Sequence, residues 1–232
     1  MPIVNVALLA PAILLACAGG CFSRPGRRPR FVLLLAEGGA LAALAIAVCA
    51  VGLLAADGPG TGPLLGHAGL GLTVRLDVVS VTMLLLVTFI GWVVVRYAAT
   101  YLDGEDRQGA FTGWLCLTLA AVLLLVTAGN LAQLVTAWIA TSLFLHRLLL
   151  FYPERPGARR AARKKFITAR LGDVALIAAA AMLASTYGTV DLGQILVAAR
   201  SGEGGGWAIA AAGLLALAAM LKSAQFPTHG WL

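Results

Sequence analysis

The stretch that decides the fold of this chain runs from Ala210 to Pro227 and reads A-A-A-G-L-L-A-L-A-A-M-L-K-S-A-Q-F-P. It is apolar enough for a membrane helix, and Lys222 is the one charged residue in it. An ionisable group at membrane depth costs about 2.5–3.5 kcal/mol on insertion scales, so it indicates a functional site. Pro227 lacks an N–H donor and predicts a helix break just beyond the charge. A lysine beside a broken membrane helix favours ion or proton handling; the alternative is a lysine that reaches the headgroups from a helix end.

The composition places the whole chain in a lipid bilayer. Of its 232 residues 60% are hydrophobic and 12% are charged, and the mean hydropathy is +0.92. Soluble domains have about 45–50% apolar and about 25% charged residues. The net charge of +7 is concentrated in two short loops, 23–30 and 153–165. This is the pattern of cytoplasmic loops in a multi-pass protein, so the basic charge does not indicate nucleic-acid binding.

Seven apolar segments are long enough to cross a bilayer, which takes about 20 residues. We expect them at 3–22, 31–55, 76–97, 111–128, 131–151, 166–187 and 207–226. None has the alternating period of a membrane strand, so the sequence predicts an all-α integral membrane protein with about seven transmembrane helices.

The loops predict the orientation of the spans. Four spans separate the basic loops 23–30 and 153–165, so both fall on one side, which we take as the cytoplasm. The loops 56–75 and 188–206 then lie outside, as does the N-terminus, whose first span has no preceding basic residues and reads as retained. The loop 98–110 must be cytoplasmic, although it carries three acidic residues.

Two exterior stretches have a recognisable pattern. Residues 70–77 alternate apolar and polar side chains, as a short strand or hairpin would. Residues 201–206, S-G-E-G-G-G, read as a flexible connector.

An ion pair is expected near the start of the sixth span. Arg170 precedes Asp173 by three residues, so the two side chains share a helix face and can pair. The pair is either an anchor of the helix end or a functional pair whose balance shifts when a proton moves nearby. Because a lysine removed from water can exchange its proton, a rearrangement involving Asp173 or Arg170 would switch the protonation of Lys222.

Three further ionisable residues are candidates for this chemistry. His146 lies late in the fifth span beside Arg147, and it is either an interfacial residue or a proton donor and acceptor. His229 follows the predicted helix break, where freed backbone groups admit water. Glu37, beside two glycines of the second span, favours close helix packing.

Sequence signatures of enzymes are absent. The chain has no G-x-G-x-x-G, Walker A, H-E-x-x-H or C-x-x-C motif. Its three histidines and four cysteines are too scattered for haem or iron–sulfur ligation. We therefore expect no cofactor, no metal site and no bond chemistry in this chain.

Three stretches carry a family resemblance: G-W…L-L-L-V-T-A-G-N-L…W, then I-T-A-R-L-G-D, then K-S-A-Q-F-P-T-H-G-W-L. From about Leu76 to Leu232 the chain resembles the proton-conducting, antiporter-like membrane subunits of respiratory complex I and of Mrp antiporters. The resemblance implies two inverted five-helix repeats, each with a discontinuous helix and a lysine near its break. Lys222 and Pro227 match the first broken helix, the seventh, and Arg170 and Asp173 match the T-R-x-G-D segment before it.

One departure from the family is at position 139. Proton-pumping members have W-E in the fifth span, with the glutamate paired to the lysine, whereas this chain has Trp138-Ile139. The stretch W-I-x-T-S-L…H-R-L-L-x-F-Y resembles a divergent branch, the membrane subunits (DabB) of DAB inorganic-carbon complexes. This implies cation flow through the membrane subunit and a peripheral zinc-binding, carbonic-anhydrase-like (DabA-type) partner. The missing glutamate leaves Asp173 as the expected partner of Lys222.

The resemblance also predicts the domain organisation. We expect residues 1–110 to form three N-terminal spans with the exterior loop 56–75, and residues 111–232 to form spans four to seven of the first repeat. Family members continue beyond the position of Leu232, so we expect the chain to be an N-terminal fragment without the second repeat.

Three functions stay open at this point. The first is a cation-conducting subunit, for protons or sodium, that energises uptake of carbon dioxide or bicarbonate in a bacterial inner membrane. The second is a proton-translocating subunit of an NADH-quinone oxidoreductase, hydrogenase or Mrp-type complex. The third is a structural membrane scaffold whose charges only anchor helices. We expect a transport subunit and no enzyme in its own right.

Overall fold

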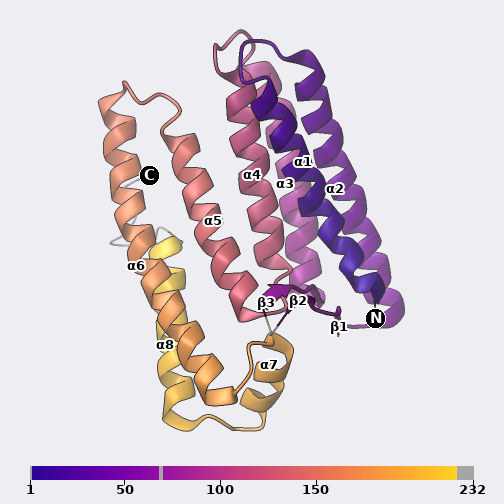
Figure 1. Cartoon of the computed structure of the whole chain (residues 1–232), viewed down its shortest axis with the longest axis vertical. Helices are drawn as coiled ribbons and strands as arrows, with labels where there is room; N and C mark the ends of the chain where they lie inside the picture. The colour runs from indigo at the N-terminus through magenta and orange to yellow at the C-terminus, as the bar shows by residue number, and fades with distance from the viewer. Residues whose placement is uncertain (1, 68–69, 224–232) are drawn as a thin grey trace. The chain divides into compact units, whose positions relative to one another are not determined.

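A computed structural model describes residues 2–67 and 70–223 (Figure 1). Within this part of the chain, seven helices are long and apolar enough to cross a membrane. These spans are Val4–Ser23, Arg30–Asp57, Val78–Tyr101, Gln108–Val126, Leu131–Leu149, Pro156–Tyr187 and Gly205–Lys222. The expectation of an all-α, multi-pass membrane protein is confirmed.

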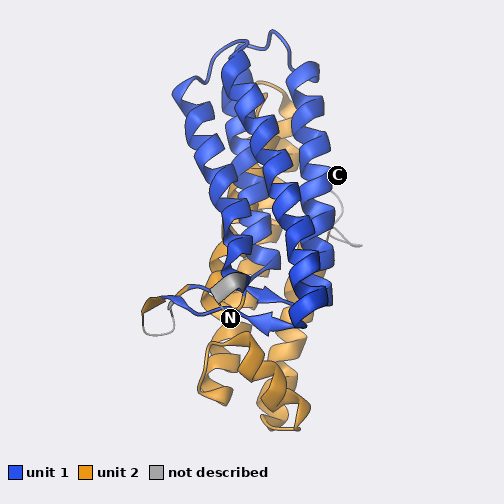
Figure 2. Cartoon of the chain, turned by 90° about the vertical axis from the view of Figure 1, so that its right-hand side faces the viewer, with its two compact units in different colours: residues 1–65, 72–128 blue, residues 66–71, 129–232 orange. Residues whose placement is uncertain are grey.

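The elements follow one another in a simple order. A 3-10 helix, η1 (Pro2–Leu8), leads into α1 (Leu9–Ser23), α2 (Arg30–Asp57), α3 (Val78–Tyr101), α4 (Gln108–Val126), α5 (Leu131–Leu149), α6 (Pro156–Tyr187), α7 (Leu192–Arg200) and α8 (Gly205–Lys222). Four short strands lie between α2 and α3: β1 (Gly60–Thr61), β2 (Leu65–His67), β3 (Leu70–Leu72) and β4 (Arg75–Leu76). The chain forms two compact units, a first of residues 1–65 and 72–128 and a second of residues 66–71 and 129–232 (Figure 2).

The first unit is a bundle in which α1 packs against α2 and α4, and α3 packs against α2 and α4. Small residues line much of its interfaces, alongside buried leucines such as Leu84 and Leu123; the buried face of α2 carries Ala36, Ala40, Ala43, Ala47 and Ala50. Large apolar side chains such as Phe31, Leu34 and Val79 are exposed instead. Small residues inside and large ones outside are typical of helices that pack closely in lipid.

Gly39 shows how close α1 and α2 approach. A Cβ atom at this position would lie 2.4 Å from the Sγ atom of Cys17. The expectation of close helix approach beside Glu37 is thus met at Gly39, whereas Gly38 faces open space. Glu37 itself pairs with Arg96 of α3 at 2.9 Å, a partner that the sequence analysis did not assign.

The strands of the exterior loop form two small sheets. The stretch predicted as one strand or hairpin is divided, because β3 pairs with β2 while β4 pairs antiparallel with β1. The following helix α3 begins with a capping box: Asp77 accepts a hydrogen bond from the Ser80 N–H, and the Asp77 N–H donates to Ser80 Oγ, each at 2.8 Å. These contacts fix where the loop ends and the membrane helix begins.

Ion pairs join the two loops at the other end of the first unit. Arg28 pairs with Asp103 at 3.0 Å, and Arg27 pairs with Asp106. The acidic loop 98–110 therefore lies on the same side as the basic loop 23–30, as the alternation of spans requires. Its acidic residues serve as partners for the arginines of its neighbour.

In the second unit α6 packs along α8 and α5 (Figure 1). An apolar core of Ala175, Leu176 and Ala218 joins α6 to α8, with Trp138 of α5 packed against it. The loop 188–206 is not irregular throughout, because residues 192–200 form α7. Backbone hydrogen bonds from Leu192 N–H to the Gly129 carbonyl (3.0 Å) and from Leu131 N–H to the Val190 carbonyl (2.9 Å) tie α7 to the start of α5.

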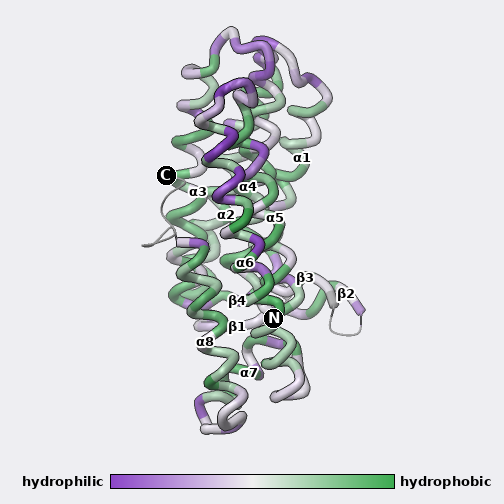
Figure 3. The backbone as a smooth tube through the Cα atoms, turned by 90° about the vertical axis from the view of Figure 1, so that its left-hand side faces the viewer, coloured by the Kyte–Doolittle hydropathy of each residue, from purple (hydrophilic) through white to green (hydrophobic). Residues whose placement is uncertain are grey.

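The largest difference from the predicted spans is the start of α6. The helix begins at Pro156, ten residues before the expected start at 166, so most of the basic stretch 153–165 is helical. Proline at the first turn and the Ala, Arg and Lys residues that follow all favour a helix. Hydropathy had excluded these turns because of their charges, which appear as hydrophilic colour along α6 in Figure 3.

The predicted boundary at residue 110 concerns the start of a family repeat, and the compact units do not test it. By contacts, α4 belongs to the first unit. The assignment of α4 to an antiporter-like repeat stays a prediction.

Candidate functional site

Lys222 is the last residue of α8, and its ammonium group lies beside the middle of α5. Its Nζ donates a hydrogen bond to the backbone carbonyl of Trp138 at 2.9 Å and lies 3.9 Å from the centroid of the Trp138 ring. Trp138 is near the middle of α5 (Leu131–Leu149), far from either helix end. A snorkelling lysine would reach toward an end of the helices, so this position favours the functional interpretation.

Asp173 and Arg170 form the ion pair that their spacing predicts. The Asp173 Oδ2 and Arg170 Nη2 atoms are 2.6 Å apart, and the Asp173 side chain is 5% exposed. The pair lies near the middle of α6 (Pro156–Tyr187), because the helix starts earlier than expected. The added turns are the basic ones, so both interpretations of the pair, an anchor of the helix end and a functional pair, stay predictions.

The hydrogen bonding of this pair is incomplete within the described part of the chain. Beyond the contact of Arg170 Nη2 with Asp173 Oδ2, the second carboxylate oxygen of Asp173 and the Nε atom of Arg170 have no hydrogen-bond partner there. Buried charges are costly unless they are paired and fully hydrogen-bonded.

Lys165 is a site residue that the sequence analysis missed. It was placed among the basic loop residues 153–165, but it is 7% exposed and its Nζ donates to the Ser142 carbonyl at 2.8 Å. The signal was available in the spacing of the buried face of α6, which carries Lys165, Ala169, Gly172 and Leu176. That spacing is helical, so Lys165 extends the buried stripe by one turn.

His146 lies on α5 beside the start of this stripe. Its ring centroid is 5.0 Å from that of Phe166, and its Nδ1 atom is buried without a hydrogen-bond partner among the described residues. His229 and Pro227 lie outside the described residues, so their predicted roles have no structural description.

Four charged side chains of α6 and α8, those of Lys165, Arg170, Asp173 and Lys222, act on one another. Lys222 lies within electrostatic reach of Asp173, Lys165 and Arg170. No ion pair joins Lys222 directly to Asp173, the partner that the sequence predicts; the carboxylate pairs with Arg170. The cluster thus holds three cations and one carboxylate. Because an arginine stays protonated, the charge of the cluster can change only at the two lysines or at Asp173.

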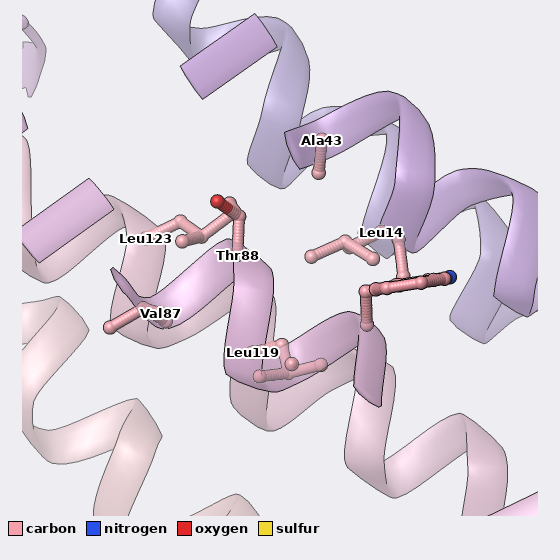
Figure 4. Close-up of a pocket in the computed structure, with 9 residues that line it drawn as sticks. Leu14, Ala43, Val87, Thr88, Leu119 and Leu123 are labelled. Carbon is pink, nitrogen blue, oxygen red and sulfur yellow. The ribbon is translucent and has the colours of Figure 1, made fainter. Parts of the chain in front are cut away.

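The described residues of the first unit contain no buried cluster of charges; Glu37 and Arg96, which pair between α2 and α3, have side chains 28% and 66% exposed. A small cavity between its helices is lined by apolar side chains and by Thr88, whose hydroxyl already donates to the Leu84 carbonyl at 2.8 Å (Figure 4). Across the described ranges, no group of three or more His, Cys, Asp or Glu residues is placed to hold a metal ion.

Two family models match this chain. Residues 128–232 match the model described as "NADH:quinone oxidoreductase/Mrp antiporter, TM", and residues 65–112 match "NADH-Ubiquinone oxidoreductase (complex I), chain 5 N-terminus". This chain belongs to the family of antiporter-like membrane subunits. A solved structure of the same type, the Mrp complex from Dietzia sp. DQ12-45-1b, has a TM-score of 0.78 and 27% identity, covering 97% of this chain and 24% of that one.

Curated relatives of this antiporter-like subunit fall into two groups. The "Probable inorganic carbon transporter subunit DabB2" of Halothiobacillus neapolitanus is 41% identical over 71% of this chain and 31% of the relative. The "NADH-quinone oxidoreductase subunit L" of Escherichia coli is 33% identical over 72% of this chain and 28% of the relative. The chain spans about a third of the length of the curated relatives it matches.

Proposed function

We propose that the complete protein containing this chain conducts cations across a bacterial cytoplasmic membrane, with Lys222 as the central ion-handling residue. The observation that carries the proposal is the position of the Lys222 ammonium. It lies beside the middle of α5 and is held by one backbone carbonyl and one indole ring, without a direct ion pair among the described residues. Such an ammonium is free to change its charge without breaking a salt bridge.

Asp173 and Arg170 set the electrostatic field around Lys222. When the arginine holds the carboxylate, less negative charge is available to the lysine; when the carboxylate is released, it stabilises the ammonium. Movement of one carboxylate between two cations thus couples the protonation of Lys222 to the local structure. His146 is a proposed proton donor and acceptor, and His229, outside the described residues, is proposed for the same chemistry from the sequence alone.

We further propose that the ion flow energises uptake of inorganic carbon together with a peripheral zinc-binding, carbonic-anhydrase-like subunit. Three DabB-named relatives are 37–41% identical to this chain, against 33% for subunit L of Escherichia coli. The isoleucine at position 139, where pumping members have glutamate, supports the same branch. The proposed partner is the part of the complex that would convert carbon dioxide to bicarbonate.

The test is the variant Lys222→Ala in the complete protein. We expect it to abolish inorganic-carbon-dependent growth in a host without its own carbonic anhydrase, while co-purification with the partner persists. Lys222→Arg should fail as well, because an arginine stays protonated. Normal bicarbonate accumulation by the assembled Lys222→Ala complex would refute the proposal and favour a structural role for the charge.

A second candidate is an antiporter-like subunit of a quinone-oxidoreductase, hydrogenase or Mrp-type complex. The likeness to the Mrp complex over 97% of this chain favours it. The subunits that co-purify with the protein discriminate between the two functions. A large soluble zinc protein supports the inorganic-carbon complex, and redox or antiporter subunits support the alternative.

We propose that the basic loops face the cytoplasm and the N-terminus faces outward. The ion pairs between loops 23–30 and 98–110 support a common side for both. In a variant without the native cysteines, Gly204→Cys should react with a membrane-impermeant thiol reagent in intact cells, and Arg28→Cys should not. The reverse labelling would overturn this orientation.

A further inference from the structure

One face of α5 receives ammonium groups from two different helices. The Trp138 carbonyl accepts a hydrogen bond from Lys222 of α8, and the Ser142 carbonyl accepts one from Lys165 of α6. Trp138 and Ser142 are four residues apart, and His146 is four residues further on. At a rise of about 1.5 Å per residue, these three positions form a stripe with steps of about 6 Å.

The two lysines occupy this stripe without a carboxylate of their own. Carbonyls in the middle of a helix already accept a backbone hydrogen bond, so they are weak substitutes for the water that an ammonium loses on burial. The charged groups around Lys165 are Arg170 and Asp173 on α6, His146 with its neighbour Arg147 on α5, and Lys222 across on α8. Only Asp173 among these is negative. A purely structural cation would be expected to have a carboxylate partner.

We propose that Lys165 is a second proton-carrying residue, which exchanges a proton with Lys222 along the Trp138–Ser142–His146 face of α5. The inference rests on the proposed function, because it extends the path that ends at Lys222. In the step, an N–H bond of the Lys165 ammonium breaks and an N–H bond forms on the neutral amine of Lys222. Asp173 and Arg170 keep their charges, so the total charge of the cluster does not change.

The geometry also indicates where Lys165 lies in the proposed proton path. It lies closer than Asp173 to the first, basic turns of α6, and its contact on α5 lies one turn nearer to His146 than the contact of Lys222. The order along the stripe is therefore His146, Lys165, Lys222. Lys165 thus lies between the basic first turns of α6 and Lys222.

The test uses the complete protein, assembled with its partners and reconstituted in liposomes with a pH-sensitive dye inside. Four variants are compared: Lys165→Met, Lys165→Arg, Lys165→His and the control Lys164→Met, whose lysine is exposed on the same helix. We expect Lys165→Met and Lys165→Arg to lower proton flux at least tenfold, and Lys164→Met to stay within twofold of the unaltered protein.

The histidine variant separates a proton carrier from a structural hydrogen-bond donor. An ordinary histidine has a pKa of about 6.5 and a lysine about 10.4, so Lys165→His should retain measurable flux with an optimum at lower pH. A structural role predicts an unchanged pH profile. If Lys165→Met does not assemble, Lys165→Arg decides, because it retains a charged donor: full flux would overturn the proposal and loss of flux would support it.

The result for Lys222→Ala in the same assay separates the two proposals. Loss of flux in Lys222→Ala with normal flux in every Lys165 variant overturns the role of Lys165 alone. Normal flux in both sets of variants overturns the proposed function as well. Loss of flux in both, with an acid-shifted Lys165→His, supports the relay.

Discussion

Charged side chains are used in opposite ways in the two compact units. In the first unit Arg28 and Asp103 pair at the loop ends, with side chains 60% and 56% exposed. In the second unit Arg170 and Asp173 pair in the middle of a helix, and the Asp173 side chain is 5% exposed. Both are arginine–aspartate pairs at bonding distance, so the difference lies in their surroundings.

The burial of an ion pair determines how much the loss of one partner costs. An exposed ion pair contributes about 0–1 kcal/mol, and either partner can be lost at little cost. Removing one partner of a buried pair leaves an uncompensated charge and costs about 3–5 kcal/mol. The first unit thus uses exposed pairs to hold loops together and one partly exposed pair, Glu37–Arg96, between helices, whereas the second contains the buried charges Lys165 and Asp173. Lys165 and Lys222 follow the second pattern.

The largest effect should come from breaking the buried pair. We expect Asp173→Asn to lower inorganic-carbon-dependent uptake at least tenfold with assembly intact, because Lys222 and Arg170 lose their shared counter-charge. Asp173→Glu should retain partial activity, and changes at Arg170 should matter less than the loss of Asp173. The readouts are growth in a host lacking carbonic anhydrase and co-purification of the complex.

The matched control is Asp103→Asn, which breaks the exposed arginine–aspartate pair in the same way. It should leave uptake within twofold of the unaltered protein. Full uptake by an assembled Asp173→Asn complex, or an equal loss of uptake in Asp173→Asn and Asp103→Asn, would contradict the proposed difference between the two pairs.

A smaller, structural effect is expected at a tight contact of the first unit. A Cβ atom at Gly109 would lie 2.1 Å from the backbone oxygen of Arg24. Gly109→Ala should therefore destabilise the protein by about 1–3 kcal/mol, as overpacking does, and lower its melting temperature in detergent. The control is Gly52→Ala, because no neighbouring atom lies within 4 Å of a Cβ atom at that position. It should leave the melting temperature unchanged.

Transport per assembled molecule should be unchanged in Gly109→Ala. A specific loss of transport by correctly assembled protein would show that the first unit contributes more than a scaffold.

The smallest effect is expected at the start of α3. Burial would raise the pKa of the Asp77 carboxyl, but the Ser80 N–H, the Arg75 guanidinium and the Ser80 hydroxyl together lower it. A lowered pKa means that the ionised carboxylate stabilises the folded state above its ordinary pKa of about 3.9, and that this contribution is lost as the pH falls through the lowered value. Asp77→Asn keeps a capping side chain and removes the charge.

We expect Asp77→Asn to cost about 0.3–1 kcal/mol at pH 7, the typical contribution of a negative charge at a helix N-terminus. The difference in melting temperature from the unaltered protein should shrink as the pH falls below 4. If the difference in melting temperature does not change with pH, the hydrogen-bond geometry of the Asp77 cap, and not its charge, stabilises the start of α3.

Several elements were predictable from the sequence because one-dimensional signals specify them. The spans follow from apolar length, and the ion pair of Arg170 with Asp173 follows from a spacing of three residues on one helix. The capping box of Asp77 and the start of α6 at Pro156 also have local signals in the sequence. A hydropathy criterion excludes the first turns of α6, however, because these turns are charged.

The sequence by itself determined that this chain is an α-helical membrane protein with a lysine in a membrane helix, since composition and local spacing suffice for both. Only the tertiary structure decided which charges are buried. Lys164 and Lys165 are adjacent and chemically identical, yet one is exposed and the other donates to the Ser142 carbonyl, 23 residues earlier in the chain. Likewise, Lys222 donates a hydrogen bond to the carbonyl of Trp138, which lies 84 residues earlier in the chain. Such partners depend on how the helices pack against one another, and no local stretch of sequence determines that packing.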